Sequence, residues 1–251
     1  MAKQTGIIKL KGTIGDISFY KSTDGHLARA KGGVDGKRIA SDPAFQRTRE
    51  NGSEFGRAGK GGKLLRNAIR VLLQNAKDKR VTSRLTRDLL AIIKTDAESG
   101  RGLRNVQGGD LSLLNTFEFN LNGKLATTLF ADYQATLDRA TGDLGVTMDP
   151  FSPTQRIAAP SGATHFKVSM GAAELDFANE AFVFDSDDTG IAPYNGEDTA
   201  AIALTASVTA NSVFPIIQVL GIEFYQEVNG EMYTLRNGSF NALAIVNVDT
   251  V

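Results

Sequence analysis

One run of acidic residues has part of the spacing of a metal-binding loop and could therefore bind a cation. The run Asp185-Ser-Asp187-Asp188-Thr-Gly190 offers oxygen ligands like those at the start of a calcium loop. In a twelve-residue loop the closing acid would fall on Gly196, whereas Glu197 comes one residue late. Asp185, Asp187 and Asp188 are therefore calcium candidates, and the alternative is a solvated acidic loop at the end of a β-sandwich.

Other chemistry is not indicated by the spacing of the residues. A phosphate-binding loop ending at Lys63 would need a glycine where the chain has Arg57 and a hydroxyl residue where it has Leu64. The two histidines, His26 and His165, lie in different halves and suggest no Ser-His-Asp grouping. Cysteine is absent, which excludes a disulfide framework, a thiolate nucleophile and a Cys-based metal site. We therefore expect no catalytic residues and no cofactor.

Charge is separated along the chain, although the totals of 28 basic and 28 acidic residues balance. Residues 1–104 hold 23 Lys and Arg but 10 Asp and Glu, a net charge of +13. Residues 105–251 hold the other 5 basic residues and 18 acids, a net charge of −13. The basic half can bind an acidic partner, and the acidic half of another copy is such a partner.

The elements of the basic half follow from turn and capping signals. Residues 5–31 predict short strands with a hairpin turn at Asp24-Gly25, and Ser41-Asp42-Pro43 is a helix start with Asp42 as its N-cap. Glycines between residues 52 and 62 either break the helix that follows or allow a close backbone approach, as in a tightly packed helix or a subunit contact. Apolar residues at helical spacing in 63–76 and 82–96 predict an αα-hairpin. The Gly-rich connection 100–109 is the expected domain boundary.

The acidic half has the pattern of β structure. Alternating residues 117–121, followed by a turn at Asn122-Gly123, predict a hairpin. Further hairpins are expected around residues 141–143 and 229–230, and a final strand over 242–248. The predicted fold is α+β: a basic N-terminal β-hairpin and α-helical hairpin in residues 1–104, followed by an antiparallel immunoglobulin-like β-sandwich in residues 105–251.

No membrane segment is predicted. The longest uncharged stretch, 199–222, alternates with a period of two over residues 202–208, which indicates a half-buried strand rather than a membrane span. The first residues contain no apolar region of a secretory signal. We therefore expect a location in the cytoplasm or in an assembled particle, with export by another route left open.

Several motifs at the two ends of the chain form a specific pattern. They are Lys11-Gly-Thr-Ile-Gly-Asp-Ile-Ser-Phe-Tyr-Lys21, the basic hairpin Leu27-Ala-Arg-Ala-Lys31, residues 42–51, residues 54–58, and residues 221–230 and 237–243, together about a third of the chain. In these motifs the chain resembles a family of proteins common in Bacteroidetes that has no known activity. The resemblance implies a non-enzymatic protein and no particular mechanism. The glycine-rich hairpin before a Pro-started, Arg-rich helix is also similar to virion and phage-tail-like structural proteins.

These observations favour a non-enzymatic structural protein that assembles into a ring, tube or filament. The basic half of one copy would dock on the acidic half of the next, a heterologous contact between copies. Exposed ion pairs contribute little, so apolar packing or strand addition must supply most of the affinity. The alternatives are a nucleic-acid-binding protein that uses the basic helices, and a phage-tail-like or virion component. A further alternative is an enzyme that uses carboxylates of the sandwich loops, for instance on glycans, although the sequence assigns no acid pair to it. The residues expected to meet are Arg66, Arg70, Arg84 and Arg87 on one copy and Asp185, Asp187 and Asp188 on the other.

Overall fold

The computed structural model describes residues 2–30 and 32–250, without the side chains of Arg236 and Asn237. Lys31, the last residue of the second motif named above, lies outside the described residues. The chain divides into two compact units, residues 1–50 and 51–251. This division differs from the expected boundary near residue 105, because the helices share a hydrophobic core with the strands that follow them.

The first unit contains an antiparallel sheet with the strand order β1-β4-β3-β2. The strands are β1 (Ala2–Lys3), β2 (Gly12–Ile14), β3 (Ile17–Ser22) and β4 (Gly25–Ala30). Ser22 pairs with Gly25, and Gly25 has a positive φ of 106°, so the predicted hairpin turn at Asp24-Gly25 is confirmed. The sheet is followed by α1 (Gly36–Ser41) and a 3-10 turn η1 (Pro43–Phe45). Asp42 caps that turn, because its side chain accepts a hydrogen bond from the Ala44 amide at 2.9 Å.

The first unit has no hydrophobic core. None of its described residues is buried, and several of its aliphatic side chains lie open. The exposed fraction is 102% for Ile7, 81% for Ile8 and 63% for Ile14. A sheet of this size needs apolar burial to be stable in water, so this unit requires a surface to pack against.

The helices of the second unit are α2, which starts before the boundary and spans Gln46–Ala68, α3 (Arg70–Leu73) and α4 (Val81–Thr95). The αα-hairpin is confirmed, and of the two alternatives for the glycines the structure has the tightly packed helix and no break. A Cβ on Gly61 would lie 3.1 Å from Val106 Cγ2, and one on Gly62 would lie 3.4 Å from Leu89 Cδ1. These two glycines allow close packing of α2, and that packing outweighs their low helix propensity.

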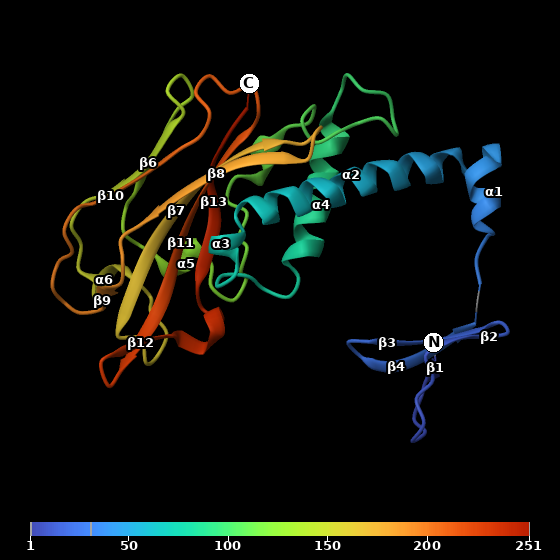
Figure 1. The fold of residues 1–251 in the computed structure, drawn as a ribbon, viewed down its shortest axis with the longest axis horizontal. Coiled ribbons are helices and arrows are strands. Elements are labelled where there is room, and N and C mark those ends of the chain that lie inside the picture. Colours follow the sequence, from blue (N-terminus) through green and yellow to red (C-terminus); the bar gives the residue numbers. More distant parts are fainter. Residues whose placement is uncertain (1, 31, 251) are drawn as a thin grey trace. The chain divides into compact units, whose positions relative to one another are not determined.

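Two antiparallel sheets form the β part of the second unit, which confirms the predicted α+β, sandwich-like fold (Figure 1). The smaller sheet has the order β10-β6-β5, and the larger one has β12-β11-β7-β8, with β13 beside β11 and β9 beside β7. The strands are β5 (Gln134–Asp138), β6 (Asp143–Met148), β7 (His165–Asp176), β8 (Ala181–Asp188), β9 (Ala192–Pro193), β10 (Ile202–Ser207), β11 (Ile216–Val228), β12 (Glu231–Thr234) and β13 (Ala242–Asp249). Short helical turns complete the unit: η2 (Leu111–Leu114), α5 (Leu125–Thr128), α6 (Pro153–Arg156) and η3 (Leu235–Gly238).

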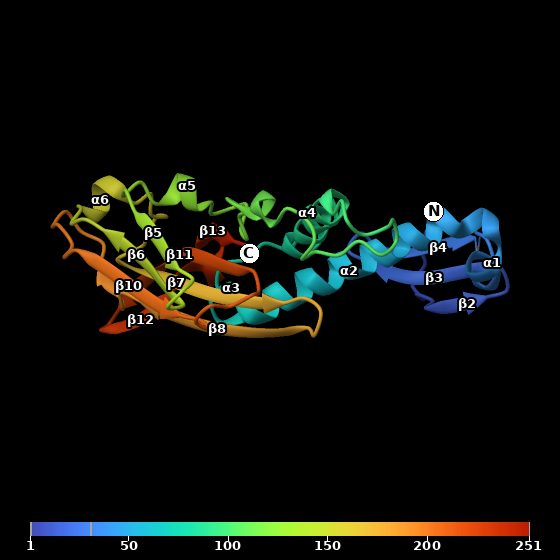
Figure 2. The same cartoon turned by 90° about the horizontal axis from the view of Figure 1, so that it is seen from above.

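Strands β7 and β11 are buried on both faces (Figures 1 and 2). Ala173 and Ile217 belong to a core shared with α2, α3 and α4, whereas Ala172 and Ile216 belong to a core shared with the smaller sheet. The helices therefore form one layer on the larger sheet instead of a separate domain. No helix among the described residues has the length and apolar character needed to cross a bilayer.

The predicted hairpins at residues 141–143 and 229–230 and the final strand are confirmed. The hairpin at Asn122-Gly123 is wrong, because residues 125–128 form the helix α5. The segment before it still pairs with the larger sheet, since the Phe119 amide donates to the Leu243 carbonyl at 2.8 Å. The alternation of residues 117–121 therefore reflects a segment that pairs with the edge of β13 and not one strand of a hairpin.

The Gly-rich connection 100–109 is held against the helices by hydrogen bonds. Asp96 at the end of α4 accepts from the amides of Glu98, Ser99 and Asn105 at 3.0–3.1 Å. Buried Glu54 of α2 accepts from the Gly102 amide at 2.8 Å. These bonds satisfy backbone groups that a flexible linker would leave to water, and so the connection is not a hinge between domains.

Gly109 allows a backbone approach that no other residue permits. A Cβ on Gly109 would overlap the carbonyl of Ile92 in α4, whereas a Cβ on Gly56 would meet no atom within 4 Å. We expect Gly109→Ala to lower the free energy of unfolding by about 1–3 kcal/mol through overpacking. We expect Gly56→Ala to raise it by about 0.5–1 kcal/mol, because alanine is the better helix former. Urea denaturation of both variants checks this, and equal stabilities would contradict the packing described here.

Asp96 links the stability of the protein to pH. The hydrogen bond from the Ser99 amide is the main cause that lowers the pKa of Asp96 to about 2. Its stabilising effect is therefore complete above its ordinary pKa of 3.8 and is lost as the pH falls toward about 2. Asp96→Ala should lower the free energy of unfolding by about 1–3 kcal/mol at pH 7. The difference from the wild type should shrink between pH 4 and pH 2 in urea titrations; a constant difference would argue against this role.

Candidate functional site

Arg84, one of the predicted docking residues, is an internal structural residue. Its guanidinium donates to Asp78 Oδ2 at 2.6 Å and to the carbonyl of Glu118 at 2.7 Å. It also lies over the ring of Phe117, 5.0 Å from its centre. The side chains of Arg84 and Asp78 are only 14% and 9% exposed. Arg84 thus fastens the start of α4 to the segment that runs beside β13.

The other three predicted arginines have different surroundings. Arg87 is exposed and pairs with its neighbour Asp88 at 2.7 Å. Arg66 and Arg70 line one cleft between the end of α2 and the start of α4. Of the four predicted arginines, only Arg66 and Arg70 line the same cleft, whereas Arg84 and Arg87 are outside that lining and form ion pairs.

Asp185 and Asp187 connect the two sheets. Asp187 Oδ2 accepts from the Thr205 amide at 3.0 Å, and Asp185 Oδ2 accepts from the Ser207 amide at 2.9 Å. Buried Glu174 continues the series by accepting from the Thr209 amide at 3.0 Å. The three carboxylates satisfy alternate amides from residue 205 to residue 209, in the second half of β10, the edge strand of the smaller sheet, and just after it. We call this set the carboxylate ladder.

Asp185 and Asp187, two of the residues predicted to bind calcium or a neighbouring copy, instead accept hydrogen bonds inside the protein. Asp188 points to the other face of β8 and binds Lys167 Nζ at 3.2 Å, so the three aspartates do not converge. Within residues 2–30 and 32–250, no group of three or more acidic or histidine side chains could hold a metal ion.

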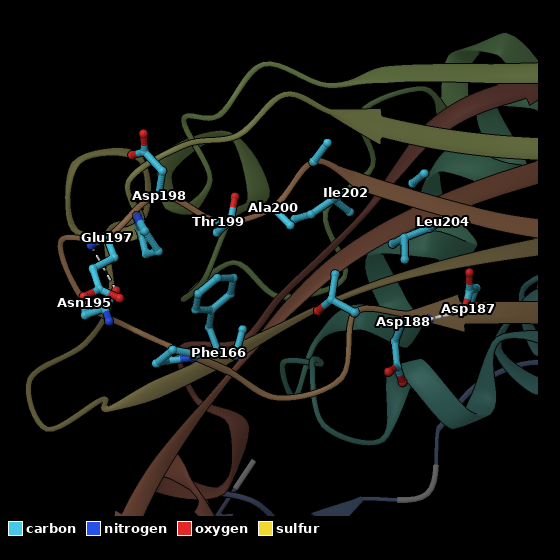
Figure 3. A pocket seen from close by; sticks show the side chains of 16 residues that line it. Phe166, Asp187, Asp188, Asn195, Glu197, Asp198, Thr199, Ala200, Ile202 and Leu204 are labelled. Carbon is cyan, nitrogen blue, oxygen red and sulfur yellow. Dashed lines mark hydrogen bonds between the residues drawn. The ribbon is translucent and has the colours of Figure 1, made fainter.

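A cleft of about 480 Å³ lies beside the ladder, between β7, β8 and β9 on one side and residues 195–204 on the other (Figure 3). Its apolar lining includes Phe166, Ile202 and Leu204. Figure 3 shows Glu197 and Asp198 at one end, Asp187 and Asp188 at the other, and Phe166 between them. The lining contains no Lys, Arg or His. We call this feature the acidic cleft.

The loop that carries Glu197 and Asp198 is fixed at both ends. The Thr154 amide donates to the Asn195 carbonyl at 3.2 Å, and the Thr199 amide donates to the Phe151 carbonyl at 2.9 Å. The side chain of Asn195 also accepts from the Glu197 amide at 3.1 Å. The carboxylates of Glu197 and Asp198 have no hydrogen-bond partner in the described part of the chain. The carboxylates of both acids are therefore available to bind a cation or a hydrogen-bond donor at the cleft.

The acidic cleft has the chemistry of a binding site for an apolar, positively charged group. The carboxylates attract cations, and the aromatic and aliphatic lining accepts an alkyl side chain. His165 lies outside the lining and contacts Thr164 Oγ1 through Nδ1 at 2.9 Å. Sequence reasoning considered Glu197 only as a late calcium ligand and missed Asp198. The adjacent acids directly after the Asn195-Gly196 turn were the signal available.

Comparisons with known proteins do not assign the chain. No protein-family model and no curated protein matches it. A Streptococcus parasanguinis structure on pH-induced modulation of adhesion by Fap1 fimbriae is similar at 11% identity and a TM-score of 0.23, covering 45% of this chain and 77% of that one. The human F-spondin reeler domain is similar at 12% identity and a TM-score of 0.17, covering 49% and 97%. At these TM-scores neither similarity supports a shared fold or function.

Removal of Arg84 should destabilise the protein, because Asp78 would lose the cation that neutralises it. We expect Arg84→Ala to lower the free energy of unfolding by about 3–5 kcal/mol, the usual cost of breaking a buried ion pair. Arg87→Ala is the control and should change it by less than about 0.5 kcal/mol, since exposed pairs contribute little. Both values follow from urea denaturation at neutral pH. If Arg84→Ala lowered the free energy of unfolding no more than Arg87→Ala does, the structural role of Arg84 would be contradicted.

Proposed function

We propose that the chain is a non-enzymatic structural protein that assembles with copies of itself. The basic first unit of one copy docks on the acidic cleft of the next. The contact is heterologous, so it produces a ring if its rotation closes and a filament or tube if it does not.

The absence of a core in the first unit is the observation that carries this proposal. A small sheet with no buried residue cannot hold its fold by internal packing. Its exposed aliphatic residues need a partner surface, and burying one isoleucine side chain stabilises a contact by about 1.5–3 kcal/mol. A second copy supplies such a surface at the concentration of the protein itself.

The segment from Gly6 to Lys11 is the part of the first unit best suited to the acidic cleft. The side chain of Gln4 accepts from the Leu10 amide at 2.8 Å and donates to the Leu10 carbonyl at 3.3 Å. These two bonds close a loop that exposes Ile7 and Ile8 almost fully. The loop is held in shape before it binds, which reduces the entropy lost on docking.

Charge gives this contact its orientation. The first unit has 10 basic and 5 acidic residues, a net of +5, and Lys9 and Lys11 lie next to the exposed isoleucines. The partner surface belongs to residues 105–251, whose net charge is −13. Lysines at the rim would face Glu197 and Asp198 while an isoleucine packs on the apolar lining. Such rim charges guide association and select the orientation, whereas apolar burial supplies the affinity.

Assembly should be visible as particles larger than a monomer in light scattering after size exclusion. At about 0.05 M NaCl we expect large regular particles, and at about 0.6 M NaCl smaller ones, because the screening length falls to a few ångströms. Negative-stain microscopy of the same fractions distinguishes rings from filaments. A monomer at both salt concentrations would contradict the proposal, and binding of DNA by that monomer would favour the nucleic-acid alternative.

Variants locate the contact. Ile8→Asp should abolish assembly, and the double change Glu197→Gln with Asp198→Asn should weaken it and reduce its dependence on salt. Val213→Asp is the matched control, because Val213 is a 65% exposed aliphatic residue of the second unit. Assembly that survives Ile8→Asp, or that fails equally with Val213→Asp, would contradict the proposed contact.

A further inference from the structure

A second cleft in the second unit is lined by cations. It has a volume of about 470 Å³ and lies between the end of α2, α3 and the start of α4. Arg66, Arg70, Lys77 and Lys79 line it, together with neutral polar groups of Asn67, Gln74 and Thr82. Arg70, Lys77 and Lys79 are exposed to solvent, which screens their mutual repulsion, and an anion in the hollow would be attracted by all four cations. We call this feature the cationic cleft.

Arg66 is the most buried of the four cations in the lining. Its Nη1 atom is shielded from solvent and has no hydrogen-bond partner in the described chain. Burial lowers the pKa of Arg66, and no acidic neighbour acts against that shift. The Nη1 atom lies beside Gly62 of α2, and an oxyanion in the cleft would offset the cost of partly burying the charge of Arg66.

The one acid in the lining is already neutralised. Asp78 binds Arg84 and accepts from the amides of Arg80 and Leu121 at 2.6 and 3.1 Å. Hydrogen bonds from these two backbone amides and from Arg84 lower the pKa of Asp78 against the opposing effect of burial. The positive charge of the four cations is therefore not balanced from within the cleft.

The start of α4 adds donors to the same place. Arg80 provides no side-chain cap, and the first turn contains no acid. Thr82 of that first turn lines the cleft. Amides in the first turn of a fifteen-residue helix point away from the helix and carry its positive dipole end.

We propose that the cationic cleft binds a phosphate-bearing anion, whose oxygens are held by Arg66, Arg70 and the first turn of α4. Two guanidinium groups match the paired oxygens of a phosphoryl group, and the lysines add charge without fixed geometry. The volume exceeds that of one phosphate ion, so an ester or a diphosphate fits. No aromatic side chain lines the cleft, which disfavours recognition of a stacked nucleic-acid base.

This site uses neither the acidic cleft nor the first unit, so it stands or fails apart from the proposed assembly. The test is calorimetric titration of the full chain with inorganic pyrophosphate at constant ionic strength, with inorganic phosphate, glutamate and a single-stranded oligonucleotide as separate arms. We expect saturable binding of pyrophosphate and weaker binding of phosphate. Glutamate should not bind, and the oligonucleotide should bind no more tightly than pyrophosphate.

Variants decide whether the binding belongs to this cleft. Arg70→Gln should weaken pyrophosphate binding at least about tenfold, a loss readily measured by titration. Lys63→Gln is the matched control, since Lys63 is an exposed cation of α2 outside the lining. Arg66→Gln should also weaken binding, with thermal unfolding confirming that it folds. Equal losses with Lys63→Gln, or no saturable binding up to about 10 mM, would overturn the proposal; tighter binding of the oligonucleotide alone would replace it with a nucleic-acid surface.

Discussion

The burial of β7 and β11 on both faces is the constraint on which the second unit depends. Apolar side chains lie on both faces of these strands: Ala173 belongs to one core and Ala172 to the other. Each face must therefore pack against another layer. The smaller sheet covers one face and the helices cover the other. Because Leu65, Leu89 and Ile217 share one core, the helices cannot be separated from the sheet without exposing both.

Many charged residues of the second unit serve the backbone or one another. Asp185 and Asp187 satisfy amides of the edge strand β10, a place where an unpaired strand would invite other strands. In the helical layer, Glu54 and Asp96 are buried, and Asp78 is paired with Arg84. These three acids therefore turn inward, whereas Glu98 and many cations of the layer remain at the surface. The separation of charge along the sequence becomes a separation between layers, with free carboxylates at the acidic cleft.

The first unit poses the opposite problem, since its sheet is hydrogen-bonded but has no core. Backbone pairing contributes little net stability without apolar burial, because water competes for the same hydrogen bonds. Ile7 and Ile8 are therefore most simply explained as parts of a contact surface, and the loop closed by Gln4 gives them a defined shape. In the proposed assembly the first unit would gain order on docking. The two clefts of the second unit, one acidic and one cationic, are the proposed places for a partner and for an anion.

Elements with strong local signals could be predicted from the sequence. Asp24-Gly25, the cap Asp42 and the apolar spacing of residues 82–96 each specify a conformation through neighbours a few residues away. The sequence also determined the separation of charge. Long-range packing chose between the two alternatives at Gly61 and Gly62 and fixed residues 100–109 to the helices. It also made Asp185 and Arg84 internal and left the carboxylates of Glu197 and Asp198 without partners in the described part of the chain. The reason is physical: which partner a glycine, a carboxylate or a guanidinium meets depends on residues far away in the chain, and local spacing carries no record of them.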